Sequence, residues 1–222
     1  MKLAVLFSGG KDSCYSVYKA AQKEKIVCLI SLISSNKESY MFHTPNIHLV
    51  ELQSKLMDIP LVKINTKGEK ESELKDLEKA IKIAVKKYKI EGIVTGAINS
   101  VYQASRIQRI CKKLNLWCFN PLWQINQEEY LKELIKNKFE IIITGIFAYP
   151  FDESYLGRKI DNNLIKELIE LKNKYQINPA GEGGEFESLV INCPLFKKRI
   201  EILESEKEYK NHSGVLNIKK AI

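Results

Sequence analysis

The hexapeptide Ser8-Gly9-Gly10-Lys11-Asp12-Ser13 lies between an apolar run at residues 3–7 and a helical pattern at residues 13–23. Glycines let the backbone turn sharply and approach a ligand closely. The N–H groups at the start of the following helix favour an anion, and the Lys11 charge and two serine hydroxyls add to that preference. A strand, this loop and a helix therefore predict a phosphate-binding site.

Two common phosphate-binding motifs do not describe this loop. A Walker P-loop needs glycine where Val5 stands, and serine or threonine directly after the lysine, where this chain has Asp12. A dinucleotide fingerprint has three spaced glycines, whereas Gly9 and Gly10 are adjacent and no third glycine follows them.

Short apolar runs and amphipathic helical patterns alternate through the first half of the chain. This alternation predicts a parallel sheet with helices on both faces, joined by right-handed crossovers. The expected strands are residues 3–7, 26–33, 61–64, 92–95 and 117–119. The expected helices are residues 13–23, 46–57 with Asn46 as its cap, 71–88 and 100–114.

The alternation weakens after Pro121-Leu122-Trp123, which predicts a domain boundary near residue 123. We expect residues 1–123 to bind nucleotide and residues 124–222 to form a smaller α+β domain that binds substrate. In the second region the pattern predicts helices at 127–136 and 162–175 and strands at 140–147, 187–192, 200–204 and 215–218.

Composition excludes several classes of protein. The 222 residues are 45% hydrophobic, and these residues are spread along the whole sequence, which excludes a disordered chain. The formal net charge is +8. The longest apolar runs fall well short of the roughly 20 residues that cross a bilayer, so no membrane partner is expected. The five cysteines form no C-x-x-C pair, which argues against a disulfide framework or zinc site and for a reducing cytoplasm. The positive charge fits nucleic acid, phosphate ligands or a lysine-rich surface.

A second glycine stands at the end of the fourth expected strand, in Gly96-Ala97-Ile98. Ligands of open α/β sheets bind at the carboxyl ends of the strands, so this turn is a candidate for nucleotide binding. Tyr102, Gln103 and Arg106 lie within about one helical turn of each other just beyond it and can share a helix face. Arg106 is either a phosphate ligand or an ordinary surface arginine.

The octapeptide Gly181-Glu182-Gly183-Gly184-Glu185-Phe186-Glu187-Ser188 combines three glycines with three glutamates. Carboxylates this close repel one another unless a cation or a pKa shift relieves them. In a basic chain, such a loop indicates a cationic substrate or a bound metal, unless it is a solvated acidic turn.

The phosphate loop resembles that of the N-type ATP pyrophosphatases, which cleave ATP between its α and β phosphates. Over essentially the whole chain the sequence resembles one family of that superfamily, the archaeal-type diphthine–ammonia ligases. The segments that carry the resemblance are residues 8–13, 39–44 (Ser-Tyr-Met-Phe-His-Thr), 96–98 with Tyr102, Gln103 and Arg106, 121–123, 152–154, 156–158 and 181–187. Ser188 departs mildly from the pattern, because many members have threonine there.

The resemblance implies a five-stranded parallel sheet of the adenine nucleotide α-hydrolase (HUP) type. It also implies that ATP activates the diphthine carboxylate of translation elongation factor 2 as an acyl-adenylate, and that ammonium then displaces AMP to give diphthamide. ATP and Mg²⁺ are the implied cofactors. A homodimer is left open, and no stable nucleic-acid partner is expected.

The resemblance and the residues together give a set of candidate site residues. Lys11, Asp12 and Glu185 are the catalytic candidates. The ATP-binding candidates are Ser8, Gly9, Gly10, Lys11, Asp12, Ser13, Gly96, Ala97, Ile98 and Arg106. The substrate-binding candidates are His43, Tyr102, Gln103, Glu182, Gly183, Gly184, Glu185, Phe186 and Glu187, of which Glu182, Glu185, Glu187 and Phe186 are expected to face the trimethylammonium group of diphthine.

Asp12 either binds Mg²⁺ beside the pyrophosphate or orients the loop as a residue of the helix start. Two alternative functions use the same fold: a tRNA-modifying ATP pyrophosphatase of thiolation or lysidine type, and a non-enzymatic ATP-binding sensor.

Overall fold

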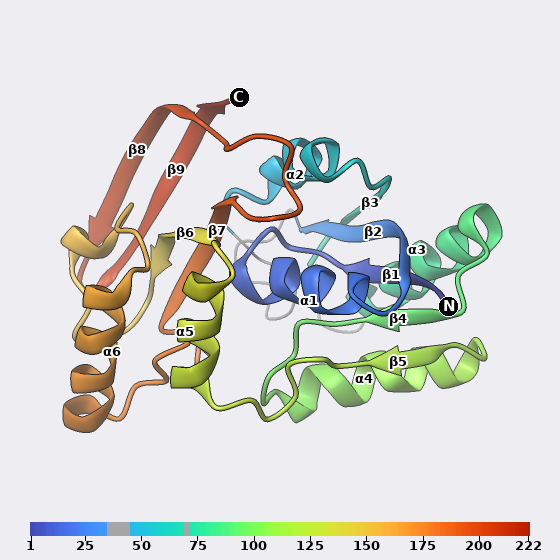
Figure 1. Ribbon diagram of the computed structural model, residues 1–222, viewed down its shortest axis with the longest axis horizontal. Helices are drawn as coiled ribbons and strands as arrows, with labels where there is room; N and C mark the ends of the chain where they lie inside the picture. Colours follow the sequence, from blue (N-terminus) through green and yellow to red (C-terminus); the bar gives the residue numbers. More distant parts are fainter. Residues whose placement is uncertain (35–44, 69–71) are drawn as a thin grey trace. The chain divides into compact units, whose positions relative to one another are not determined.

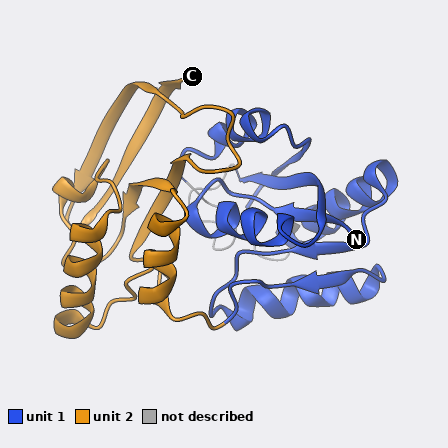
Figure 2. Cartoon of the chain, viewed as in Figure 1, with its two compact units in different colours: residues 1–123 blue, residues 124–222 orange. Residues whose placement is uncertain are grey.

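The computed structural model describes residues 1–34, 45–68 and 72–222. The chain divides into two compact units, residues 1–123 (unit 1) and 124–222 (unit 2), shown in blue and orange in Figure 2. The segment 39–44, which includes the candidate His43, lies outside the described residues.

Unit 1 contains a parallel five-stranded sheet of strand order β3-β2-β1-β4-β5, as expected for the nucleotide-binding fold (Figure 1). Its strands are β1 (Lys2–Leu6), β2 (Lys25–Ser34), β3 (Leu61–Thr66), β4 (Gly92–Val94) and β5 (Trp117–Phe119). The order places β1 at the centre, so the loop that follows β1 leaves the carboxyl edge of the sheet from its middle strand. Ligands of open α/β sheets bind at this edge.

The helices of unit 1 are α1 (Lys11–Ala21), α2 (Val50–Met57), α3 (Ser72–Tyr88) and α4 (Val101–Lys113). Buried side chains of α3 and α4, such as Ile81 and Ile110, share one core with strand residues such as Ala4. Leu3 and Val5 are just as buried but lie outside that core, on the opposite face of β1. Helices thus cover both faces of the sheet, which is why its central strands are apolar throughout.

Asn46 lies at the N-cap position of the helical segment that contains the second helix, as expected, but its side chain makes no capping hydrogen bond. Asn46 has a left-handed backbone conformation (φ 62°) and precedes a 3₁₀ turn, η1 (Ile47–Leu49), after which α2 begins at Val50. This left-handed backbone departs from the extended conformation that is typical of N-cap residues.

Unit 2 contains an antiparallel four-stranded sheet of order β7-β6-β9-β8 (Figure 1). Its strands are β6 (Glu140–Ile146), β7 (Phe186–Asn192), β8 (Ile202–Lys210) and β9 (Ser213–Ala221), and its helices are α5 (Gln127–Lys136), α6 (Asn162–Tyr175) and the 3₁₀ turn η2 (Glu153–Tyr155). β8 and β9 form a long hairpin whose two turn residues, Asn211 and His212, both have positive φ, as a type I′ turn requires.

No helix among the described residues is long and apolar enough to span a membrane.

Candidate phosphate loop and acidic glycine loop

The loop between β1 and α1 leads directly into the N-terminus of a helix. Gly10 caps α1 with an extended backbone (φ −76°, ψ 171°), and its carbonyl accepts the first helical bond from the Cys14 N–H at 3.1 Å. The N–H groups of the first turn have no acceptor within the helix, and the helix dipole makes this end partly positive. The backbone therefore offers an anion-binding site where the sequence predicted one.

Gly9 is held in place by a glutamine that sequence reasoning missed. Its φ of +81° is costly for other residues, and a Cβ there would lie 2.3 Å from Oε1 of Gln53. Gln53, on α2, is fully buried and donates from Nε2 to the Gly9 carbonyl at 3.0 Å. Glycine is therefore required here by both backbone conformation and packing.

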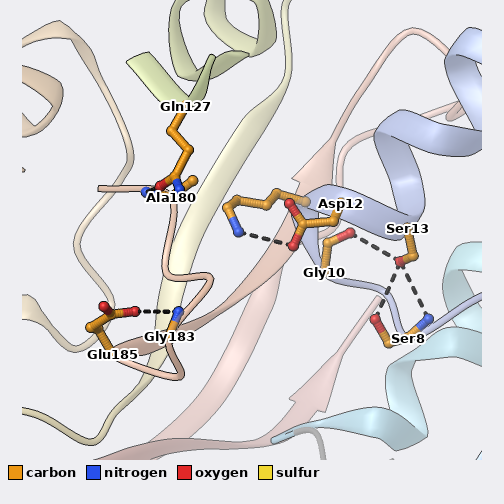
Figure 3. A network of polar contacts seen from close by, with 9 residues as sticks. Ser8, Gly10, Asp12, Ser13, Gln127, Ala180, Gly183 and Glu185 are labelled. Atoms are coloured by element: carbon orange, nitrogen blue, oxygen red, sulfur yellow. Dashed lines mark hydrogen bonds and ion pairs between the residues drawn. The ribbon is translucent and has the colours of Figure 1, made fainter. Parts of the chain in front are cut away.

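The two serine hydroxyls lie inside the loop (Figure 3). The Ser13 hydroxyl donates to the Gly10 carbonyl at 3.1 Å and accepts from the Ser8 N–H at 3.3 Å. Ser8 Oγ lies 3.3 Å from Ser13 Oγ. Because Ser13 is buried, its hydroxyl holds the shape of the loop, while the half-buried Ser8 is the more accessible of the two.

Lys11 and Asp12 form an ion pair in which Nζ and Oδ2 are 2.9 Å apart. The Lys11 side chain is only 4% exposed and that of Asp12 is 29% exposed, so the carboxylate is the partner that solvent or a ligand reaches. Within the described ranges no three Asp, Glu, His or Cys side chains come together as a metal site. Magnesium in nucleotide sites takes one or two carboxylates together with substrate phosphates and water. A single carboxylate, such as that of Asp12, is enough for this pattern.

Gly96 packs directly on the start of α1. A Cβ at Gly96 would lie 3.0 Å from both the Asp12 carbonyl carbon and the Ser13 nitrogen, so the structure brings this predicted turn against the phosphate loop. Ala97 and Ile98 are buried, and Ala97 donates its N–H to Thr95 Oγ1 at 3.2 Å. The side chains of Ala97 and Ile98 therefore pack in the interior. The part of residues 96–98 that is left for a ligand at the carboxyl edge of the sheet is the backbone.

Tyr102 and Arg106 share a face of α4, as their spacing predicted. The Arg106 guanidinium lies 3.4 Å from the centroid of the Tyr102 ring and donates to the Tyr102 carbonyl at 3.4 Å. The Gln103 N–H donates to Oγ of Ser100, the N-cap of α4, at 3.3 Å, which fixes the start of the helix. Stacking on the ring orients the arginine without neutralising its charge.

In unit 2, Glu185 holds the acidic glycine loop, residues 181–187, together. It is 8% exposed, and its Oε1 accepts from the Asn178 N–H at 2.7 Å and from Asn178 Nδ2 at 2.9 Å. Its Oε2 accepts from the Gly183 N–H at 2.8 Å (Figure 3). A Cβ on Gly183 would lie 2.6 Å from Glu185 Oε1, so glycine is needed for this bond.

Gln127, at the start of α5, bonds to the residues that lead into this loop. Its Oε1 accepts from the Ala180 N–H at 3.0 Å, and its Nε2 donates to Asn178 Oδ1 at 3.3 Å. Neither Gln127 nor Asn178 was singled out from the sequence. Gln127 bonds to residues 51 and 53 positions further along the chain, and no local pattern marks either side chain as a partner of this loop.

The four residues expected to face a cation divide into two pairs. Glu182 and Glu187 are half-exposed. Glu185 and Phe186 are buried, and the Phe186 ring, 2% exposed, packs edge-on against Phe151 with centroids 5.9 Å apart. The structure thus gives Glu185 and Phe186 an interior position in the loop and leaves Glu182 and Glu187 as its more exposed carboxylates.

Tyr155 and Arg158, in and near the segments 152–154 and 156–158, form a polar network with Glu167 of α6. The two Nη atoms of Arg158 donate to the Glu167 carboxylate, one of them at 3.0 Å, and the Tyr155 hydroxyl donates to the same carboxylate. This pairing with Arg158 holds the pKa of Glu167 below its usual range. The network links η2 to α6. The role that it gives to Arg158 is structural, because its charge is paired with Glu167.

Comparison with known proteins covers both units. The model of the diphthamide synthase N-terminal domain matches residues 1–117, and that of the C-terminal domain matches residues 126–222. Diphthine–ammonia ligases of Bos taurus and Homo sapiens are each 37% identical over 226 residues, which span 93% of this chain and 84% of those proteins. The Schizosaccharomyces pombe ligase is 31% identical over 96% of this chain and 38% of its own length.

Among solved structures, a predicted subunit of tRNA methyltransferase from Methanocaldococcus jannaschii aligns with a TM-score of 0.44 at 18% identity. The alignment covers 90% of this chain and 99% of that one, a likeness too weak to bear on function. The two domain models and the relatives above agree with the motifs. The chain belongs to the diphthamide synthase family, whose curated relatives are diphthine–ammonia ligases.

Proposed function

We propose that this protein is an AMP-forming ligase that amidates the diphthine residue of translation elongation factor 2 with ammonium, at the expense of ATP. The observation that carries the proposal is a phosphate loop built on the N-terminus of α1, in a chain that matches the family over both units. The products are diphthamide, AMP and pyrophosphate.

The first half-reaction is the task of unit 1. A carboxylate oxygen of diphthine attacks the α-phosphorus of ATP, the bond from that phosphorus to the β-phosphate oxygen breaks, and pyrophosphate leaves. The enzyme needs to hold the groups in line and to neutralise the departing charge. The N–H groups of the first turn of α1 and the Lys11 ammonium supply positive charge for the pyrophosphate. Arg106 is a further proposed phosphate ligand, held by Tyr102.

A magnesium ion bound with the nucleotide would add neutralising charge, and Asp12 is the residue that would hold it. Its partly exposed carboxylate remains within reach of Lys11, so the same side chain also keeps the lysine in place before ATP arrives.

In the second half-reaction ammonium first loses a proton to solvent. The nitrogen of the resulting ammonia attacks the acyl carbon, the bond between that carbon and the AMP oxygen breaks, and the nitrogen loses a second proton to solvent as the amide forms. Unit 2 is proposed to bind the diphthine side chain. Glu182 and Glu187 face its fixed positive charge, and Glu185 acts as a positioning residue through the loop backbone.

The experiment supplies ATP, ammonium and a diphthine-bearing elongation factor, and measures AMP together with the mass loss expected when an acid OH becomes an amide NH₂. We expect both with the wild-type protein, and neither with Lys11→Met. Lys23→Met is the matched control, because Lys23 is an exposed lysine just beyond α1. AMP formation no greater than in factor-free controls would defeat the proposal.

The same preparation tests the alternatives. A tRNA-modifying enzyme would bind tRNA in a salt-sensitive way and form AMP in its presence, and an ATP sensor would bind ATP without releasing pyrophosphate. Neither alternative is favoured by the relatives.

A further inference from the structure

Phe147, which sequence reasoning did not single out, lies directly beside the acidic glycine loop. It follows the last residue of β6, and its N–H donates to the Glu185 carbonyl at 2.9 Å. Unlike the aromatic residues of the adjacent core, its side chain is 40% exposed. An aromatic ring is therefore presented to solvent at the edge of the loop.

The ring of Phe147 packs directly over Gly145. A Cβ on Gly145 would lie 2.8 Å from both Cε2 and Cζ of the Phe147 ring, closer than real side-chain atoms approach. The ring therefore occupies the space above Gly145 that any other residue would fill. The ring can take this position because Gly145, within β6, has no side chain.

The same glycine places a carboxylate-bearing residue beside the ring. Gly145 pairs with Glu187 across the antiparallel strands β6 and β7, and the Cβ of Glu187 lies 3.2 Å from the point where a Gly145 Cβ would be. Phe147 and Glu187 thus adjoin on one face of the sheet. Glu187 is half-exposed, so the ring and the glutamate side chain are both reachable from that face.

The chemistry of the proposed substrate selects such an arrangement. A trimethylammonium group has no N–H and cannot donate a conventional hydrogen bond, so a protein recognises it by electrostatic attraction and by apolar contact with its methyl groups. An aromatic face provides both, and a neighbouring carboxylate adds charge. Phe186 cannot serve, because its ring is buried against Phe151.

We propose that the aromatic ring of Phe147 contacts the trimethylammonium group of diphthine, with Glu187 beside it. This inference rests on the proposed function and names a specificity-determining residue for it. The ring favours the quaternary cation over a primary ammonium, because a primary ammonium is small and strongly hydrated.

The test compares Phe147→Leu with the wild-type protein in the amidation assay. The control is Tyr149→Leu, which removes another exposed aromatic of the same segment, one whose ring instead packs on Tyr175 and His212. Loss of the cation–ring contact should raise the KM for the diphthine-bearing factor by about 2- to 30-fold in Phe147→Leu, with the Kd for ATP unchanged. Tyr149→Leu should match the wild-type protein.

Two further readouts separate contact with the cation from a structural role. The wild-type preference for diphthine over the same side chain carrying a primary amine should fall in Phe147→Leu and persist in Phe147→Tyr. Tetramethylammonium chloride should inhibit the wild-type protein more than sodium chloride at equal ionic strength, and this difference should shrink in Phe147→Leu.

An unchanged KM in Phe147→Leu, or an equal loss towards the quaternary and primary amines, would overturn the inference while leaving the ligase function intact. If the wild-type protein forms no AMP with the factor, the proposed function itself fails.

Discussion

Replacing Glu185 with glutamine tests whether this residue acts on the substrate or through the loop. The carboxylate accepts two hydrogen bonds at Oε1, of 2.7 and 2.9 Å, and one at Oε2, of 2.8 Å. A glutamine that keeps its oxygen at the Oε1 position retains two bonds but turns its NH₂ group toward the Gly183 N–H, donor against donor. The flipped amide retains only one bond, so the first arrangement is preferred.

The expected loss of stability follows from the number of hydrogen bonds that the substitution affects. One charge-assisted hydrogen bond is lost, a donor is left without an acceptor, and the other two bonds lose their charged acceptor. Hydrogen bonds to charged groups contribute about 1.5–3 kcal/mol, so we expect the loop to be less stable by about 2–3 kcal/mol. The opening equilibrium of the loop should then rise by roughly 30- to 150-fold.

Native-state hydrogen exchange measures this opening residue by residue. The Gly183 and Asn178 amides, which donate to the carboxylate, should exchange faster by that factor in Glu185→Gln, while amides in the interior of α6 should not change. Glu182→Gln is the matched control in the same loop, because Glu182 is half-exposed and none of the three bonds ends on it.

The kinetic consequence separates the two roles. If Glu185 acts through the loop, amidation should fall in step with the faster exchange, and ATP binding should be unaffected. Unchanged exchange at Gly183 together with a large loss of amidation would refute the positioning role and restore the idea that Glu185 touches the reacting groups.

Three further predictions concern other parts of the molecule. Gly96→Ala places a Cβ 3.0 Å from two backbone atoms in the first turn of α1, so the Kd for ATP, measured by titration calorimetry, should rise about 5- to 100-fold with the protein still folded. A hydrogen bond from the Cys111 thiol lowers the pKa of Cys118, so iodoacetamide at about pH 8 should label Cys118 first among the five cysteines, as read by peptide mass spectrometry. The hydrogen bonds from Arg158 lower the pKa of Glu167, so their contribution to stability is present at neutral pH and is lost as pH falls below the ordinary glutamate value of 4.5. Urea unfolding should therefore become more pH-sensitive below that value in the wild-type protein than in Glu167→Gln.

Much of the fold could be predicted because burial leaves a local pattern. The helices at residues 127–136 and 162–175 and the strand at 117–119 were confirmed with their expected bounds, since apolar spacing and polar flanks mark their ends. The hairpin β8–β9 was underestimated, because β8 is exposed along nearly its whole length and alternates Glu, Ser and Lys instead of apolar residues. A strand that buries no face gives no period to detect.

The candidate site shows the same limit at the level of side chains. The order of residues predicted the phosphate loop, because a loop between strand and helix is a local feature. The direction of the Glu185 carboxylate depends on Asn178, and the shape of the phosphate loop depends on Gln53. These partners are brought close by the fold, and neither has a neighbour in sequence that marks its role.

The glycines of the two units show why a glycine-rich motif alone does not identify a ligand. At Gly9 the space of a side chain is taken by Gln53, at Gly183 by Glu185, and at Gly145 by the Phe147 ring. At Gly184 nothing lies within 4 Å, and only the backbone conformation, with φ +82°, favours glycine. In the first three cases the glycine admits a particular polar or aromatic group, and that group sets the chemistry. A glycine in a motif is therefore understood from the neighbour that it admits: the Gln53 amide in the phosphate loop of unit 1, and the Glu185 carboxylate and the Phe147 ring in unit 2.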